Sequence, residues 1–179
     1  MNVPNLLTLT RVLLIPVFVI FIINKSHGWA IATFAVAGIT DLADGLIARL
    51  AHQRTELGAY FDPIADKLLL SSAYVTLAIT GDLPSWLTIV VITRDLVILL
   101  GFSVFFLTNY RPRIRPSWIS KVTTNFQIIT VLLALLAGCC SLFTRVTPVG
   151  IYGTALFTIL SGAHYIYLGT QVLNGKQTR

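Results

Sequence analysis

Four of the six aspartates in this chain fall within 26 positions, in the pattern Asp-x2-Asp-Gly-x2-Ala-Arg-x8-Gly-x3-Asp-x3-Asp. They are Asp41, Asp44, Asp62 and Asp66, and the sequence around them is strongly apolar. A carboxylate at the centre of a bilayer costs about 2.5–3.5 kcal/mol, so four of them need compensation. Divalent metal ions supply it, together with a substrate whose phosphates complete the coordination. The pattern therefore predicts phosphate chemistry inside a membrane.

The first two aspartates share one face of a predicted helix. At 100° per residue, an arc of about 100° contains Asp41, Asp44, Gly45 and Ala48. Arg49 lies just beside that arc. Small residues favour close helix packing, but here they also leave room beside the acids for a substrate group. Because the acids share their face, we favour a substrate role for Gly45 and Ala48.

The other two aspartates, Asp62 and Asp66, are one turn apart on the next predicted helix, and Gly58 stands one turn before them. The connection over residues 50–57 is short, which makes the two helices antiparallel neighbours. All four carboxylates can then converge on one site. They are too many for a single ion that must also hold water and phosphate. They suit two metal ions that clamp the attacking and leaving oxygens.

Composition agrees with a membrane setting. Of 179 residues, 55% are apolar and 11% charged, and the mean hydropathy is +0.81, whereas a soluble domain is nearer a quarter charged. A net charge of +6 favours anionic lipid head groups and phosphorylated substrates, and no nucleic-acid partner is expected. Hydrophobic segments of nearly spanning length cover 6–24, 29–50, 63–80, 84–108, 122–143 and 148–173. We predict an all-α membrane protein in which residues 1–179 form one bundle of six transmembrane helices.

Six spans place both termini on the same side of the membrane. The loops on the other side hold only two basic residues, Lys25 and Arg145. The loops and ends on the side of the termini hold more: Arg54, Arg111, Arg113, Arg115, Lys121, Lys176 and Arg179. This imbalance predicts cytoplasmic termini and a cytoplasmic acidic motif, in a bacterial inner membrane. The adjacent Cys139 and Cys140 are expected to be small core side chains rather than a disulfide.

The fixed positions of the acidic pattern match the full signature of the CDP-alcohol phosphatidyltransferase family, which the chain resembles over nearly its whole length. The resemblance includes Pro-Asn-Leu-Leu-Thr-Leu-Thr-Arg at 4–11 and Phe-Asp-Pro-Ile-Ala-Asp-Lys at 61–67. It implies a six-helix membrane enzyme, usually homodimeric, that uses Mg²⁺ or Mn²⁺. Such enzymes transfer a phosphatidyl group from CDP-diacylglycerol to an alcohol and release CMP.

The resemblance also implies a role for each matched residue. The metal ligands would be Asp41, Asp44, Asp62 and Asp66. Asp66 would in addition be the general base, because a carboxylate within hydrogen-bond reach can take the proton of the acceptor hydroxyl. The residues implied to hold CDP-diacylglycerol are Asn5, Leu6, Leu7, Thr8, Gly45, Arg49 and Thr55. Ala48 and Gly58 belong to the same signature and are assigned to the substrate site with them.

The second half of the chain is expected to choose the acceptor alcohol. Arg94 and Asp95 lie near the middle of the fourth hydrophobic segment. Arg94 either pairs with Asp95 or binds a substrate phosphate beside the acidic site, and we favour the phosphate. Lys121, near the start of the fifth segment, is the other predicted phosphate ligand.

Two branches of the family compete as models for the acceptor. Bacterial phosphatidylglycerophosphate synthases typically carry a second arginine two turns after the first, where this chain has Phe102. The run from Ile119 to Gln127 is more similar to the CMP-forming cardiolipin synthases. A dianionic acceptor such as glycerol 3-phosphate needs more than one cation. We therefore favour phosphatidylglycerol as the acceptor, with glycerol 3-phosphate as the alternative.

Two other classes of protein would also place acids in a membrane. A divalent-cation transporter predicts acids distributed in depth over several helices, whereas four cluster here at one level. A catalytically silent lipid-binding scaffold has no need of all four acids. The enzyme is the preferred interpretation.

Overall fold

The computed structural model describes residues 3–50, 56–107 and 118–173, with side chains described for 10–40, 67–101, 118–168 and 170–171. All regular secondary structure in the described residues is helical, so the predicted all-α class is confirmed. Six helices are long: α1 (Val3–Ile23), α2 (His27–Leu50), α3 (Glu56–Ile79), α4 (Ser85–Leu107), α5 (Trp118–Cys139) and α7 (Thr147–Leu173). A short helix, α6 (Ser141–Thr144), stands between the last two.

The six hydrophobic segments correspond in order to the six long helices, with two differences at their ends. Helix α3 begins at Glu56 rather than at 63, because hydrophobicity marks only the apolar part of a helix that also includes the polar start of the motif. Helix α5 covers Trp118–Cys139 rather than 122–143, because Cys140 is extended, with φ −146° and ψ 120°, and separates α5 from α6.

The expectation of a core position for Cys139 and Cys140 is wrong. Both are exposed free thiols. They lie where α5 ends, so the apolar run that contains them does not pass through the middle of the bundle.

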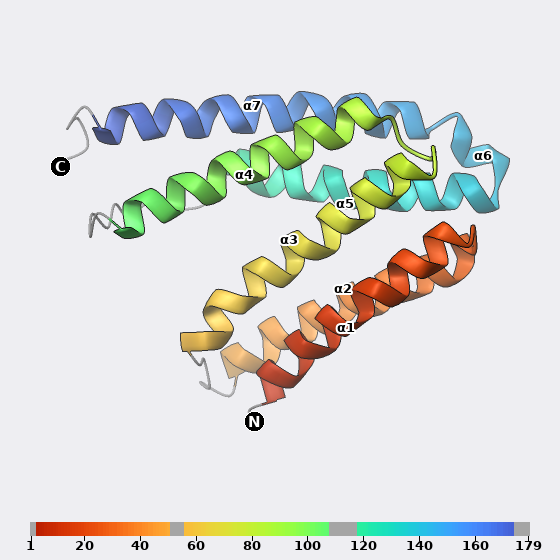
Figure 1. Cartoon of the computed structure of the whole chain (residues 1–179), viewed down its shortest axis with the longest axis horizontal. Helices are drawn as coiled ribbons and strands as arrows, with labels where there is room; N and C mark the ends of the chain where they lie inside the picture. The colour runs from red at the N-terminus through yellow and green to blue at the C-terminus, as the bar shows by residue number, and fades with distance from the viewer. Residues whose placement is uncertain (1–2, 51–55, 108–117, 174–179) are drawn as a thin grey trace.

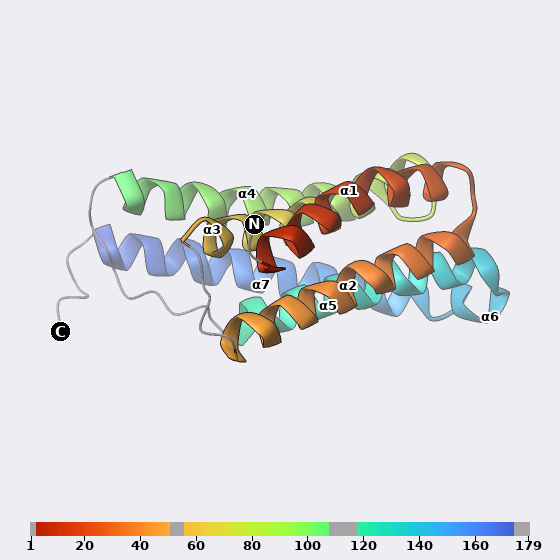
Figure 2. The same ribbon diagram turned by 90° about the horizontal axis from the view of Figure 1, so that it is seen from below.

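The long helices run back and forth along one bundle, and the start of α1 lies at the same end as the end of α7 (Figures 1 and 2). Helix α1 packs against α2 and α3, and α7 packs against α4 and α5. Helix α5 also contacts α2 and α3, so it joins the N-terminal group of helices to the C-terminal group.

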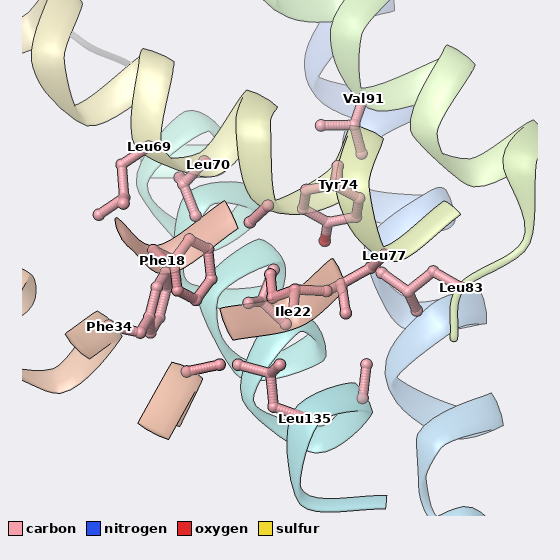
Figure 3. Packing of buried hydrophobic residues seen from close by; sticks show 14 of the residues in the cluster. Phe18, Ile22, Phe34, Leu69, Leu70, Tyr74, Leu77, Leu83, Val91 and Leu135 are labelled. Carbon is pink, nitrogen blue, oxygen red and sulfur yellow. The ribbon is translucent and has the colours of Figure 1, made fainter. Parts of the chain in front are cut away.

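The core lies where α1, α2, α3 and α5 meet (Figure 3). The rings of Phe18 and Phe34 pack with centroids 5.5 Å apart, which fixes α1 on α2. Ile22, Leu77 and Leu135 are fully buried from three helices. This packing fixes α2 and α3 next to the parts of the two helices that carry the acids.

The helices α1 and α3 end in the same type of turn, at the end of the bundle away from the termini. The amide of Ser26 donates to Phe21 O, and that of Asp82 to Leu77 O, each closing a six-residue turn. The residue before each donor is left-handed: Gly81 has φ 83°, and Lys25 has φ 56°. Lysine is uncommon there, but its ammonium donates to Thr80 O at 2.9 Å, which ties the end of α1 to a terminal carbonyl of α3.

Threonines join α5 to α7. The hydroxyls of Thr130 and Thr154 are 2.8 Å apart, and Thr154 also donates to Phe126 O at 3.0 Å. Thr123 donates to Phe157 O at 3.0 Å. Small polar side chains that bond across helices are favoured between helices in lipid, so this interface is suited to an apolar surrounding.

Large apolar side chains remain exposed on each of the six long helices, among them Leu13, Ile39, Ile79, Leu100, Ile129 and Ile159. Soluble monomers rarely expose apolar surface so widely. Two stretches of the described residues, Trp118–Cys139 and Thr147–Leu168, are long and apolar enough to cross a membrane. Shorter apolar stretches occur at Thr10–Ile23, His27–Thr40 and Lys67–Ile79.

Candidate active site

The acidic pattern is divided between the facing ends of two consecutive helices. The C-terminal part of α2 carries Asp41, Asp44, Gly45, Ala48 and Arg49, and the N-terminal part of α3 carries Gly58, Asp62 and Asp66. These ends and the first turns of α1, which carry Asn5, Leu6, Leu7 and Thr8, lie at one end of the bundle (Figures 1 and 2). The side chains of these residues lie outside the described set, and Thr55 lies outside the described residues. Their convergence on one site stays a prediction.

Helices α2 and α3 are held by shared partners. Helix α1 packs against both of them, and so does α5. The same two helices therefore support both acid-bearing helices, which the short connection between α2 and α3 does not reveal.

Lys67 follows Asp66 directly and is the first side chain of α3 that the structure describes. Its ammonium lies 2.6 Å from Asp95 Oδ1 on α4. The Lys67 side chain is 38% exposed and that of Asp95 is 10% exposed. This ion pair fixes the end of the acidic pattern to α4, and sequence reasoning did not assign Lys67 a partner.

Arg94 is almost completely buried, at 5% exposure, and its guanidinium is bound on several sides. Nη1 donates to Asp95 Oδ1 at 2.7 Å. Nη2 donates to Ser120 Oγ on α5 at 2.6 Å and to Ser161 Oγ on α7 at 2.7 Å, and Nε donates to Ser161 Oγ at 3.2 Å. The pairing of Arg94 with Asp95, which the sequence left open as the alternative, is present. A role of Arg94 in binding substrate stays a prediction.

One oxygen of Asp95 serves both cations. Oδ1 accepts from Lys67 and Arg94, whereas Oδ2 is buried and has no hydrogen-bond partner among the described residues. The three charges sum to +1. Bonds between charged groups in a low-dielectric interior are strong, so the network holds α3, α4, α5 and α7 in one arrangement.

Lys121 lies on the first turn of α5 and is exposed. Its ammonium lies 5.6 Å from the ring centre of Trp118, within the range of a cation–π contact. Because it is exposed, Lys121 is accessible to an anionic group, as a phosphate ligand must be. Phe102, the other position that bears on the acceptor, lies on α4, and its side chain is outside the described set.

Two residues of the network carried no functional signal in the sequence. Ser120 belongs to the Ile-Ser-Lys run, in which Lys121 is the predicted phosphate ligand. Ser161 is one of several small residues in α7. Lys67 is part of the motif run and could have been expected to face an acid. Only the packing of α4 against α7, and of α5 against α7, reveals that both serines meet one guanidinium.

Comparison with known proteins gives one family. The family model for CDP-alcohol phosphatidyltransferase matches residues 1–160. A probable phosphatidylglycerophosphate synthase of Mycobacterium tuberculosis is 37% identical over 99% of this chain and 86% of its own length. The CMP-forming cardiolipin synthase of Rattus norvegicus is 34% identical over 98% of this chain and 65% of its own, and that of Homo sapiens 40% identical over 76% and 50%.

Proposed function

Because the chain belongs to the CDP-alcohol phosphatidyltransferase family and is thus an enzyme, we propose that it transfers a phosphatidyl group from CDP-diacylglycerol to phosphatidylglycerol and releases CMP. The family match over residues 1–160, which contain the complete acidic signature, carries the proposal of donor and reaction. The relatives are named as two different synthases, so their names do not decide the acceptor of this chain. The choice of acceptor depends on this chain's own residues.

The donor set of the proposed site fits Mg²⁺ or Mn²⁺. Hard cations of this kind prefer carboxylate oxygens, and α2 and α3 each bring two aspartates to the same end of the bundle. Asp41, Asp44, Asp62 and Asp66 would hold two ions, which when bound neutralise the diphosphate and stabilise the departing CMP. The described side chains, which do not include these four aspartates, contain no cluster of three or more His, Cys, Asp or Glu.

The protein's own residues then divide the remaining work. Asp66 takes the proton from the acceptor hydroxyl, which makes its oxygen a nucleophile toward the phosphorus of the donor. Residues Asn5 to Thr8, Gly45, Ala48, Arg49, Thr55 and Gly58 hold the donor. Binding donor and acceptor together aligns the reacting atoms and lowers the entropic part of the barrier.

The choice of phosphatidylglycerol follows from the charges near the site. The network of Lys67, Arg94 and Asp95 carries a net charge of only +1. The position two turns after Arg94 holds Phe102, so it adds no further cation. A phosphodiester is a monoanion and needs one cation, which the network or the accessible Lys121 provides. Glycerol 3-phosphate, with a charge close to −2 at neutral pH, is the alternative acceptor.

We also propose that all six long helices cross the membrane, since each keeps large apolar side chains exposed. The bias of basic residues favours cytoplasmic termini and a cytoplasmic active site in a bacterial inner membrane. There the acyl chains of both lipids remain in the bilayer while their head groups reach the aspartates. A homodimer is proposed by family resemblance alone.

Release of CMP tests the reaction. Purified protein in lipid vesicles, given CDP-diacylglycerol, phosphatidylglycerol and Mg²⁺, should release CMP, and excess chelator should stop the release. The same vesicles, loaded with a divalent-cation dye, test the other class of function. Cation entry without CMP release would replace the enzyme by a transporter.

A further inference from the structure

Arg94 stands at the meeting point of three helices, and most of its hydrogen-bond donors are already in use. Its guanidinium makes one bond to Asp95 on α4, one to Ser120 on α5 and two to Ser161 on α7. Its carbon Cζ also lies 6.0 Å from the ring centre of Tyr165. Four of the five N–H groups that a guanidinium offers are thereby used inside the protein.

Only one N–H group of Arg94 is left over, so a phosphate could form a two-bond contact with the guanidinium only by replacing one of these partners. The two serine hydroxyls are the partners most readily replaced, because they are neutral, whereas Asp95 is charged. At 5% exposure Arg94 cannot turn its head group toward water without loss of its buried bonds. Lys67, at 38% exposure, is the cation of the network that is accessible from outside.

Building on the proposed function, we propose that Ser120 and Ser161 are specificity-determining residues for the acceptor. Their hydroxyls hold the Arg94 guanidinium within the bundle, so that it compensates Asp95 and does not serve as a ligand for an acceptor phosphate. The network then presents one net positive charge through Lys67. That charge suits a phosphodiester and leaves a phosphomonoester dianion undercompensated.

The serines have this effect because they come from the two helices that close around Arg94. Ser120 lies one residue before the accessible Lys121, so its bond to Arg94 also fixes the start of α5. Ser161 accepts from two nitrogens of the same guanidinium and sets the plane of that group. The adjacent Gly162 lies beside the Arg94 stem, whose Cγ is at van der Waals distance, 3.7 Å, from the position that a Cβ would occupy.

The test removes both hydroxyls and measures acceptor preference. In the Ser120→Ala/Ser161→Ala variant, three of the four guanidinium bonds are lost, and Arg94 gains N–H groups for a substrate phosphate. The ratio of kcat/KM for glycerol 3-phosphate to kcat/KM for phosphatidylglycerol should rise about tenfold or more, as one or two bonds to a charged group would give. The change should lie mainly in the KM for glycerol 3-phosphate. Ser72→Ala, which removes a hydroxyl that donates only to Leu69 O within α3, should leave the ratio unchanged.

Inorganic phosphate provides a second measurement. It should inhibit transfer to phosphatidylglycerol more strongly in the double variant than in the wild type, because it presents the same dianionic group. If the double variant does not fold, Ser120→Ala alone should move the ratio and the inhibition in the same direction by smaller factors. An unchanged or lower ratio in folded protein, with unchanged inhibition, would overturn the role of the serines.

Measurements on the wild-type protein distinguish a failure of this inference from a failure of the proposed function. A wild type that releases no CMP with either acceptor contradicts the proposed reaction. A wild type that prefers glycerol 3-phosphate contradicts both the proposed acceptor and the exclusion of dianions. A wild type that prefers phosphatidylglycerol, together with an unchanged ratio in the variant, contradicts the inference about the serines alone.

Discussion

The ammonium of Lys67 lies 2.6 Å from Asp95 Oδ1, and this contact joins the residue after Asp66 to the middle of the fourth long helix. The same oxygen accepts from Arg94 at 2.7 Å. The end of the acidic signature and the region expected to choose the acceptor are therefore physically connected. A substitution in one of them is expected to affect the other.

The two ion pairs of Asp95 should differ in their importance for stability. Asp95→Asn leaves the buried Arg94 charge uncompensated, which should cost about 3–5 kcal/mol. Lys67→Met removes a partly exposed cation and should cost about 1 kcal/mol or less. Thermal unfolding in detergent should therefore show a much larger fall in Tm for Asp95→Asn. Equal falls in Tm would contradict the asymmetry that the burial of Arg94 predicts.

Asp66→Asn should abolish transfer without unfolding the protein. The amide keeps the size of the side chain but cannot accept the acceptor's proton, and a general base contributes roughly 10²–10⁴-fold to the rate. The initial rate of CMP release should fall by at least that factor, with Tm close to that of the wild type. Asp82→Asn is the matched control, because Asp82 pairs with Lys25 at the opposite end of the bundle. Activity of Asp66→Asn at a tenth of the wild-type rate would remove Asp66 from the role of base.

The loss of activity on metal removal should be reversible, and metal binding should depend on the aspartates of both α2 and α3. Chelation should stop CMP release, and Mg²⁺ or Mn²⁺ should restore it, because the four carboxylates are hard oxygen donors. Titration with Mn²⁺, followed by calorimetry or by paramagnetic resonance, should give two ions per chain. Asp44→Asn on α2 and Asp62→Asn on α3 should each weaken binding. An affinity and a stoichiometry for Mn²⁺ that neither variant changes would place the metal elsewhere.

Gly138 should tolerate a side chain poorly. A Cβ at this position would lie 2.5–2.6 Å from three atoms of the His27 ring, so the ring would have to move to admit it. Gly138→Ala should cost about 1–3 kcal/mol through overpacking, seen as a lower Tm. Gly38→Ala is the control, since a Cβ there meets nothing within 4 Å.

Removing the imidazole supplies the reverse test of this contact. His27→Ala in the Gly138→Ala background should recover part of the lost Tm, because the two groups would no longer overlap. No recovery would mean that the cost arises from something other than the His27 ring.

The order of the helices could be predicted from the sequence because long apolar runs alternate with polar breaks such as Lys25–Gly28 and Gly81–Pro84. Helix ends were less predictable. The start of α3 is polar, and only the extended backbone of Cys140 marks the end of α5. Hydrophobicity reports the surroundings of a residue, whereas a helix end depends on backbone hydrogen bonds.

The candidate site, too, could be predicted from the sequence only in part. The four acids could be proposed as one site from their spacing along the chain, and the backbone places them on the C-terminal part of α2 and the N-terminal part of α3, whereas their convergence stays a prediction. The sequence offered Asp95 as a possible partner of Arg94, and that pair is present. It did not indicate the serine partners, since Ser120 and Ser161 are 41 positions apart in the sequence and meet only when α5 packs on α7.

Identification of the lipid product distinguishes the two candidate acceptors and tests the reaction in the same experiment. Purified protein in vesicles would receive CDP-diacylglycerol and Mg²⁺ with equal amounts of phosphatidylglycerol and glycerol 3-phosphate, and the lipids formed would be identified by mass spectrometry. Cardiolipin should form, in a one-to-one ratio with released CMP. Phosphatidylglycerophosphate as the main product would contradict the proposed acceptor, and the absence of both new lipid and CMP would contradict the proposed reaction.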